Sequence, residues 1–135
     1  MPITFHPKLG TVLMCDYSGF RAPEMVKKRP VVVVSRKHRE LATVVPLSGT
    51  EPVPLEKCHH EMRDASLPPP FRGKAMWAKC DLITTVAFHR LDRVRSGKHP
   101  TTGKRMYCAK PVCPEDLTAI QEAVLHVLGL SSLTK

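Results

Sequence analysis

The chain has 135 residues, which suits one domain, and its 42% hydrophobic content excludes an intrinsically disordered protein. No apolar run approaches the length of a membrane span, and the first residues lack the apolar centre of a signal peptide, so we expect a cytoplasmic protein without a membrane partner. The net charge is +9. Residues 21–40 hold seven basic and two acidic residues, and residues 88–110 hold seven basic and one acidic. This clustering indicates a polyanionic partner such as nucleic acid, although a high pI can also serve solubility alone.

The first part of the chain has the pattern of strands joined by one long loop. We predict strands at residues 10–17, 30–35 and 42–47, and a loop at residues 18–28. Four consecutive valines, Val31 to Val34, indicate a strand that is buried on both faces. Pro46 is expected near the end of its strand or at a sheet edge, because proline cannot donate to the ladder.

The middle of the chain has weaker signals. Residues 48–73 are predicted to be irregular, with Pro68-Pro69-Pro70 as a short extended connector. Further strands are expected at residues 74–80 and 106–112, with an apolar β-branched stretch at 81–88 and a basic, turn-rich stretch at 88–103.

The C-terminal segment is the clearest helix. Pro114 suits the first helical position, and the acidic Glu115 and Asp116 suit the positive end of the helix dipole. An apolar stripe at helical spacing follows, and Gly129 is a typical helix end. Strands first and one helix last predict a small β-barrel or sandwich capped by a C-terminal α-helix.

Several short segments occur in a characteristic order. They are Gly10, Arg29-Pro30, Val31 to Ser35, Val45 to Ser48, Lys79-Cys80-Asp81, Thr85-Val86, Arg90-Leu91 and the helix from Pro114 to Leu130. Together they resemble the MazF/PemK/Kid family of type II toxin-antitoxin endoribonuclease toxins, over residues 8 to 130. The resemblance implies an SH3-like β-barrel, one toxin domain spanning residues 1–135, a homodimer, a cognate antitoxin, and sequence-specific cleavage of single-stranded RNA (mRNA interferase activity).

RNA cleavage by attack of its own 2′-OH needs proton transfer and stabilisation of a charged phosphorane, and none of these steps needs a metal or a cofactor. Arg29 is the first candidate, because a planar guanidinium presents paired donors to phosphate oxygens. The family resemblance implies a catalytic arginine at this Arg-Pro step. The alternative is a solvated arginine at the start of a strand.

Ser48 is the second candidate. The resemblance places it where many family members carry a catalytic threonine, and its hydroxyl can also donate to a phosphate oxygen. The alternative is a turn serine, since Gly49 follows it. Thr50 is a nearby hydroxyl that could replace it in binding RNA.

Asp81 and Lys79 form the third candidate group. The resemblance to the Kid branch implies an aspartate and an arginine at these two positions in catalysis. Asp81 could act as a base or hold Arg29, whereas Lys79 could bind phosphate without a bidentate contact. A salt-bridged pair is the alternative. The chain departs from the family at Leu82, where glutamine is frequent, and in the absence of a histidine from residues 18–28.

The first loop supplies the expected RNA-binding side chains, which are Phe20, Arg21, Lys27 and Lys28. The basic residues could follow a phosphate backbone, and Phe20 could stack on a base or instead plug the barrel. His59 and His60 are either a proton shuttle or a pair of surface residues.

Three other interpretations stay open. The protein could be a basic barrel that binds RNA or DNA without cutting it, or a degenerate toxin that retains only its antitoxin partner. A zinc site could draw on Cys58, His59, His60, Cys80, Cys108 and Cys113. Zinc is disfavoured, because only Cys108 and Cys113 approach the spacing of a ligand pair. In a reducing cytosol the five cysteines are expected as free thiols.

Overall fold

The computed structural model describes residues 2–36, 40–108 and 110–133. Within these residues the strands are β1 (Val12–Cys15), β2 (Arg29–Arg36), β3 (Leu41–Ser48), β4 (His59–Glu61), β5 (Trp77–Lys79), β6 (Thr84–Ala87), β7 (Leu91–Lys98) and β8 (Arg105–Cys108). The α-helix is α1 (Pro114–Val127), and the short 3₁₀ turns are η1 (Asp64–Ser66), η2 (Pro69–Phe71), η3 (Cys80–Leu82), η4 (Phe88–Arg90) and η5 (Ser131–Leu133).

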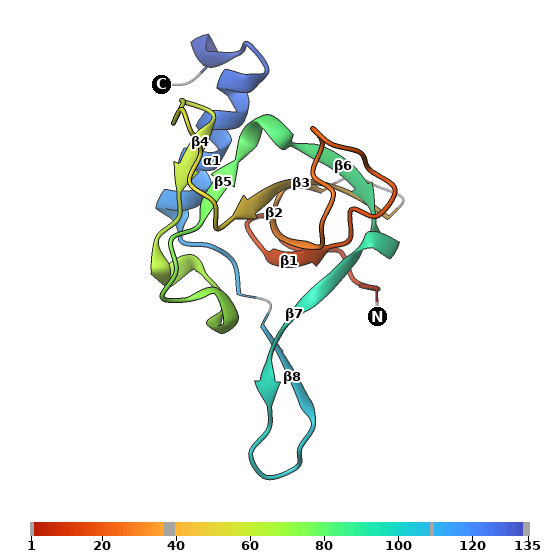
Figure 1. Ribbon diagram of the computed structural model, residues 1–135. Coiled ribbons are helices and arrows are strands. Elements are labelled where there is room, and N and C mark those ends of the chain that lie inside the picture. Colours follow the sequence, from red (N-terminus) through yellow and green to blue (C-terminus); the bar gives the residue numbers. More distant parts are fainter. Residues whose placement is uncertain (1, 37–39, 109, 134–135) are drawn as a thin grey trace.

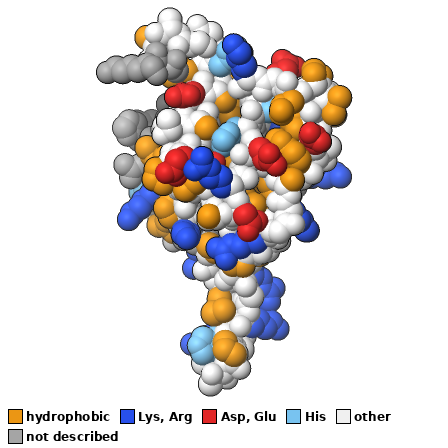
Figure 2. Space-filling model, turned by 90° about the vertical axis from the view of Figure 1, so that its left-hand side faces the viewer, with side chains coloured by type: hydrophobic (Ala, Val, Ile, Leu, Met, Phe, Trp, Pro, Cys, Tyr) orange, Lys and Arg blue, Asp and Glu red, His pale blue; other side chains and the backbone are white. Residues whose placement is uncertain are grey.

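The strands form one antiparallel sheet in the order β4-β5-β3-β2-β1-β7-β8, with β6 beside β3. The sheet curls around an interior bounded by β1, β2, β3 and β6, and the β7–β8 hairpin extends away from the body (Figures 1 and 2). The predicted class, a small β-barrel with a C-terminal helix, is confirmed. The hydrogen-bonded path of the described strands has two ends, so the barrel is open.

The valine strand separates two apolar clusters. Val32 packs in the cluster beneath α1, whereas Val31 and Val33 pack in the cluster inside the curled sheet, and all three are fully buried. The predicted burial on both faces is therefore confirmed. The strand therefore contributes side chains to both clusters.

Pro46 lies near the end of β3, as predicted, but in an interior strand. β3 pairs with β6 up to Val44 and with β5 from Leu47 onward. Pro46 occupies the gap between these two partners, where the missing N–H costs no ladder hydrogen bond.

Three predictions in the middle of the chain are wrong. Residues 59–61 form β4 because they pair with β5, although their sequence has no strand pattern. Residues 91–98 form β7 because β1 and β8 pair with them on either side. The proline triplet is not an extended connector, since Pro69–Phe71 is a 3₁₀ turn.

The helix begins at Pro114 and ends at Val127, and Gly129 follows with a φ of 75°, as a helix end favours. Asp116 in its first turn is completely buried and accepts hydrogen bonds from Ser66 Oγ at 2.5 Å and from the Arg63 N–H at 3.0 Å. The loop before β5 is thereby attached to the helix. No helix of the described residues is both long and apolar enough to cross a membrane.

Candidate active site

Arg29 and Ser48 lie at neighbouring strand ends. Val31 is paired with Pro46 in the register of β2 and β3, and both strands continue for two residues beyond that pair. Arg29 and Ser48 are each two residues beyond the last pair of this ladder, and residues two apart on a strand project to the same face. Both side chains are therefore expected on the face that carries Val31 and Pro46.

The same face of the sheet continues across β5 and β4. Ser48 is paired with Trp77, and Lys79 is paired with His59. The residues between them alternate to the other face, where Ala78 joins the cluster beneath α1. We call the face that carries Arg29, Ser48, Trp77, Lys79 and His59 the site face. Three of the four expected catalytic residues therefore share one face.

Arg29 has an unused donor. The residue is half-buried, and its Nε is buried without a hydrogen-bond partner among the described residues. A buried N–H without an acceptor costs free energy, so such groups are rare in folded proteins and a ligand is one way to satisfy them. No ion pair or hydrogen bond joins Arg29 to Asp81 in the described part of the chain, so Asp81 does not hold Arg29. An anionic oxygen would satisfy this donor.

Ser48 is only 2% exposed, and its Oγ accepts the N–H of Thr50 at 3.2 Å. These contacts are those of a turn serine. Thr50 itself is exposed. The hydroxyl that solvent can reach at this strand end therefore belongs to Thr50.

Asp81 lies in η3, directly after β5, and its side chain is 48% exposed. Its Oδ1 is 3.7 Å from Nε2 of His59, whereas no ion pair with Lys79 forms between these described residues. The partner of Asp81 is thus His59, which the sequence pattern left unassigned.

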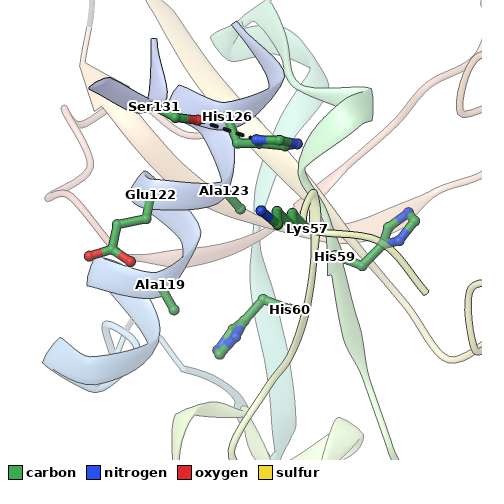
Figure 3. Close-up of a pocket in the computed structure, with 8 residues that line it drawn as sticks. All are labelled: Lys57, His59, His60, Ala119, Glu122, Ala123, His126 and Ser131. Carbon is green, nitrogen blue, oxygen red and sulfur yellow. Dashed lines mark hydrogen bonds between the residues drawn. The ribbon is translucent and has the colours of Figure 1, made fainter. Parts of the chain in front are cut away.

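The two adjacent histidines have different surroundings. His59 Nδ1 accepts the N–H of Glu56 at 3.1 Å, so the ring proton is carried by Nε2, which faces Asp81 and Cys58 Sγ. His60 projects to the opposite face, where its Nε2 is 2.8 Å from Oδ1 of Asp116. Figure 3 shows this difference in a pocket of about 300 Å³ between β4 and α1, where His60 points towards the helix and His59 away from it.

Cys58, His59 and Asp81 are the one described group whose ligand atoms, all within 4.8 Å of one another, could hold a metal ion. Two features disfavour binding. The lone pair of Nδ1 is used by the Glu56 N–H, so a metal on Nε2 would require this hydrogen bond to break. Burial, followed by the nearby carboxylates of Asp81 and Glu56, raises the pKa of the Cys58 thiol. Cys80 is a neighbour of this group, since its N–H donates to the carbonyl oxygen of Cys58 at 2.9 Å, but its thiol is buried beneath α1 and is not one of the three ligands.

The first loop, residues 16–28, is closed by aromatic packing. The Phe20 ring meets Tyr17 edge-on at 5.3 Å, and the guanidinium of Arg90 lies 5.0 Å from the Phe20 centroid. These contacts match the interpretation of Phe20 as a plug. Its remaining surface lines a hollow of about 200 Å³ together with Met25 and Asp81. Outside the plug, Arg21, Lys27 and Lys28 are exposed.

Arg90 is a residue whose role the sequence pattern did not reveal. Its Nη1 donates to the carbonyl oxygens of Asp16 at 2.9 Å and Ser18 at 2.8 Å. It thereby fixes the loop that leads into Arg29. The only signal in the sequence was its place in the Arg90-Leu91 landmark.

The curled sheet with a C-terminal helix occurs in solved toxin structures. The chain is similar in fold to MazF from Deinococcus radiodurans, with a TM-score of 0.64, 12% identity and coverage of 93% of this chain and 98% of that one. It is also similar to an endoribonuclease in complex with its cognate antitoxin from Mycobacterial species, with a TM-score of 0.60, 21% identity and coverage of 92% and 96%.

Residues 8–107 match the family described as PemK-like, MazF-like toxin of type II toxin-antitoxin system, and the chain belongs to this family. Its full-length relatives include the uncharacterized protein YifN of Escherichia coli (strain K12), 31% identical with coverage of 98% of this chain and 99% of the relative. An uncharacterized protein of Haemophilus influenzae is 30% identical, with coverage of 94% and 93%.

Proposed function

We propose that the protein is a toxin that acts as a sequence-specific, metal-independent endoribonuclease on single-stranded RNA in the cytoplasm. The observation that carries this proposal is the buried, unpartnered Nε of Arg29 on the site face. In a family of toxins whose fold is shared with endoribonucleases, a phosphate oxygen is the acceptor that this donor best fits.

In the proposed reaction the 2′-oxygen attacks the adjacent phosphorus, and the bond from phosphorus to the 5′-oxygen breaks. Asp81 accepts the 2′-OH proton, and its contact with His59 fixes the carboxylate. Arg29 and Lys79 neutralise the charge that develops on the phosphorane oxygens. The exposed Thr50 hydroxyl holds the phosphate, and the buried Ser48 positions Thr50 by accepting its N–H. The leaving 5′-oxygen takes a proton from water or from Asp81.

The partners follow from the family. We propose that residues 1–135 act as one toxin domain, that two copies form a homodimer, and that a cognate antitoxin inhibits it, as the neighbour solved with its antitoxin suggests. Arg21, Lys27 and Lys28 in the first loop would follow the RNA backbone beside Arg29.

One observation favours a second candidate, a toxin fold that binds RNA or antitoxin but no longer cuts. Ser48 is buried, and its hydroxyl oxygen accepts the N–H of Thr50 in a turn. One expected catalytic hydroxyl is therefore not accessible to solvent. This candidate differs from the first in that Arg29 would contribute to binding alone.

The test is incubation of a long single-stranded RNA with purified protein in excess EDTA. We expect discrete internal cuts at a recurring short sequence, and loss of cutting in Arg29→Ala. Arg63→Ala is the matched control, because Arg63 carries the same charge but pairs with Glu115 on the helix. Intact RNA after incubation with folded, dimeric protein would exclude the ribonuclease and leave the binding candidate.

A further inference from the structure

The β7–β8 hairpin is a basic arm that the proposed active site does not use. It projects from the body of the molecule, and Lys and Arg side chains gather along one of its edges (Figure 2). Its exposed basic residues are Arg93, Arg95, Lys98, Lys104 and Arg105. No ion pair joins any of them to an acidic side chain in the described ranges.

A β-bulge in β7 places basic side chains of the hairpin on one face of it. The register shifts between Arg95 and Gly97, so Arg95 is opposite Tyr107 and Lys98 is opposite Arg105. Tyr107 and Arg105 are two residues apart on β8 and share a face. Arg95 and Lys98 are three residues apart, so in a regular strand their side chains would project to opposite faces. The extra residue in the bulge, Ser96, places both side chains on the same face.

This arrangement is unfavourable for the fold itself. Lys98 and Arg105 are directly opposite in the ladder, and like charges in that position are destabilising. A hairpin optimised for stability alone would place an acidic residue at one of the two positions. The repulsion is relieved when an anion lies between the two side chains.

The basic face also carries an aromatic ring and is preorganised. The guanidinium of Arg93 lies over the Tyr107 ring, 3.9 Å from its centroid, so a planar cation is stacked on the aromatic side chain. At the tip, His99 Nδ1 accepts the N–H groups of Thr101 and Thr102, and its carbonyl oxygen accepts the N–H of Gly103. The face is thus built before a ligand arrives.

The basic face reaches the first loop. A hollow of about 380 Å³ at the base of the hairpin is lined by Arg93, Arg95, Arg105 and Tyr107 together with Lys28 of the first loop, and Asp92 is the acidic residue in its lining. Lys28 directly precedes Arg29. The hollow therefore joins the hairpin to the end of the first loop, one residue before the proposed catalytic arginine.

We propose that this face of the β7–β8 hairpin is a second RNA-binding site, which holds the phosphate backbone of the single strand that extends beyond the cleaved bond. The inference rests on the proposed function, because it takes the RNA bound at Arg29 as the occupant. Its basis is the pairing of aligned phosphate-binding charges with the stacked Arg93 and Tyr107, because bases stack on guanidinium planes as well as on aromatic rings. The site binds by charge and stacking, so it adds affinity for long RNA without adding sequence preference.

The test measures binding rather than cleavage. Fully 2′-O-methylated single strands of 7 and 30 nucleotides lack the attacking hydroxyl and cannot be cut by this chemistry. The variant is the triple substitution R95Q/K98Q/R105Q. The charge-matched control is K8Q/K57Q/K74Q, which removes three exposed lysines from other surfaces. Thermal unfolding of each variant verifies the fold.

For the 30-nucleotide strand we expect the hairpin variant to reduce the slope of log Kd against log salt concentration by about 2, and affinity at moderate salt by about tenfold or more. The control should change both quantities by much less, and binding of the 7-nucleotide strand should change less than about twofold. Equal losses in the hairpin variant and the control would overturn the inference, as would a wild-type protein that binds both lengths equally. RNA that is bound through the hairpin but never cut in its unmodified form would contradict the proposed function alone.

Discussion

Arg90 Nη1 lies 2.8 Å from the carbonyl oxygen of Ser18, although 72 residues separate them in the sequence. The same nitrogen donates to Asp16, and the guanidinium covers the ring of Phe20. Arg90, the last residue of η4, therefore fixes the loop that precedes Arg29.

The substitution Arg90→Gln tests this role. It should lower the stability of the fold by about 2 kcal/mol, because two carbonyl oxygens lose a charged donor, and it should release the first loop. Limited trypsin digestion is the measurement, because the loop contains Arg21, Lys27 and Lys28. We expect cleavage in the loop to be faster than in wild type under native conditions. An unchanged digestion rate would show that packing of Phe20 alone is sufficient.

Asp116 should make stability depend on pH. Burial opposes ionisation of this carboxyl, but the hydrogen bonds from Ser66, His60 and the Arg63 N–H outweigh it and lower the pKa. A lowered folded pKa stabilises the protein above the ordinary aspartate value of about 4, and this contribution is lost as the pH falls through the lowered value.

We therefore expect Asp116→Asn to cost about 3 kcal/mol in the free energy of unfolding near pH 7. The difference from wild type should shrink below about pH 4. Urea unfolding across pH values measures it. Glu115→Gln is the control, because this exposed neighbour in the same helical turn should change stability little. A difference that stays constant down to pH 3 would assign the loss to packing instead.

Ser48 and Thr50 should contribute differently to catalysis. Thr50→Val keeps the shape of an exposed side chain but removes its hydroxyl, and should lower kcat/KM on RNA by about 100-fold if that hydroxyl contacts the phosphate. Ser48→Ala should mainly cost about 1 kcal/mol of stability, because it removes the acceptor of the Thr50 N–H. The reverse order of kcat/KM losses would mean that Ser48 becomes exposed when RNA binds.

Lys98→Gln should stabilise the protein. It removes one of two like charges that lie opposite each other in the hairpin, which should raise the free energy of unfolding by about 0.5 kcal/mol at low salt. The gain should diminish in 1 M salt, where the repulsion is screened. Destabilisation at low salt would indicate that Lys98 has a favourable partner.

The sequence predicted the parts of the fold that local patterns determine. The buried valine run, the helix that begins at Pro114 and the place of Pro46 near the end of its strand follow from burial, the preference of proline for the first helical position and the missing proline N–H. β4 and β7 were missed because their residues are polar, and pairing with neighbouring strands makes them strands.

In the candidate site, too, the sequence predicted some features, whereas others depend on contacts between distant segments. The order of segments along the chain predicted Arg29 and Ser48 as site residues, and both lie two residues beyond the last pair of the β2–β3 ladder. The contact of Asp81 with His59 could not be predicted, because it depends on η3 turning the chain beside β4. The burial of Ser48 and the role of Arg90 likewise arise from contacts between segments distant in sequence.

The central claim is metal-free cleavage by the 2′-OH with Arg29 at the phosphate. Its most direct test is a short RNA that contains one mapped cut site, compared in EDTA with the same RNA carrying a single 2′-deoxy nucleotide before the cut. We predict 2′,3′-cyclic phosphate and 5′-hydroxyl ends from the first and an intact second, with Arg29→Ala slower by about 100-fold or more on the first. Cutting of the deoxy substrate, or an unchanged rate in Arg29→Ala, would contradict the claim.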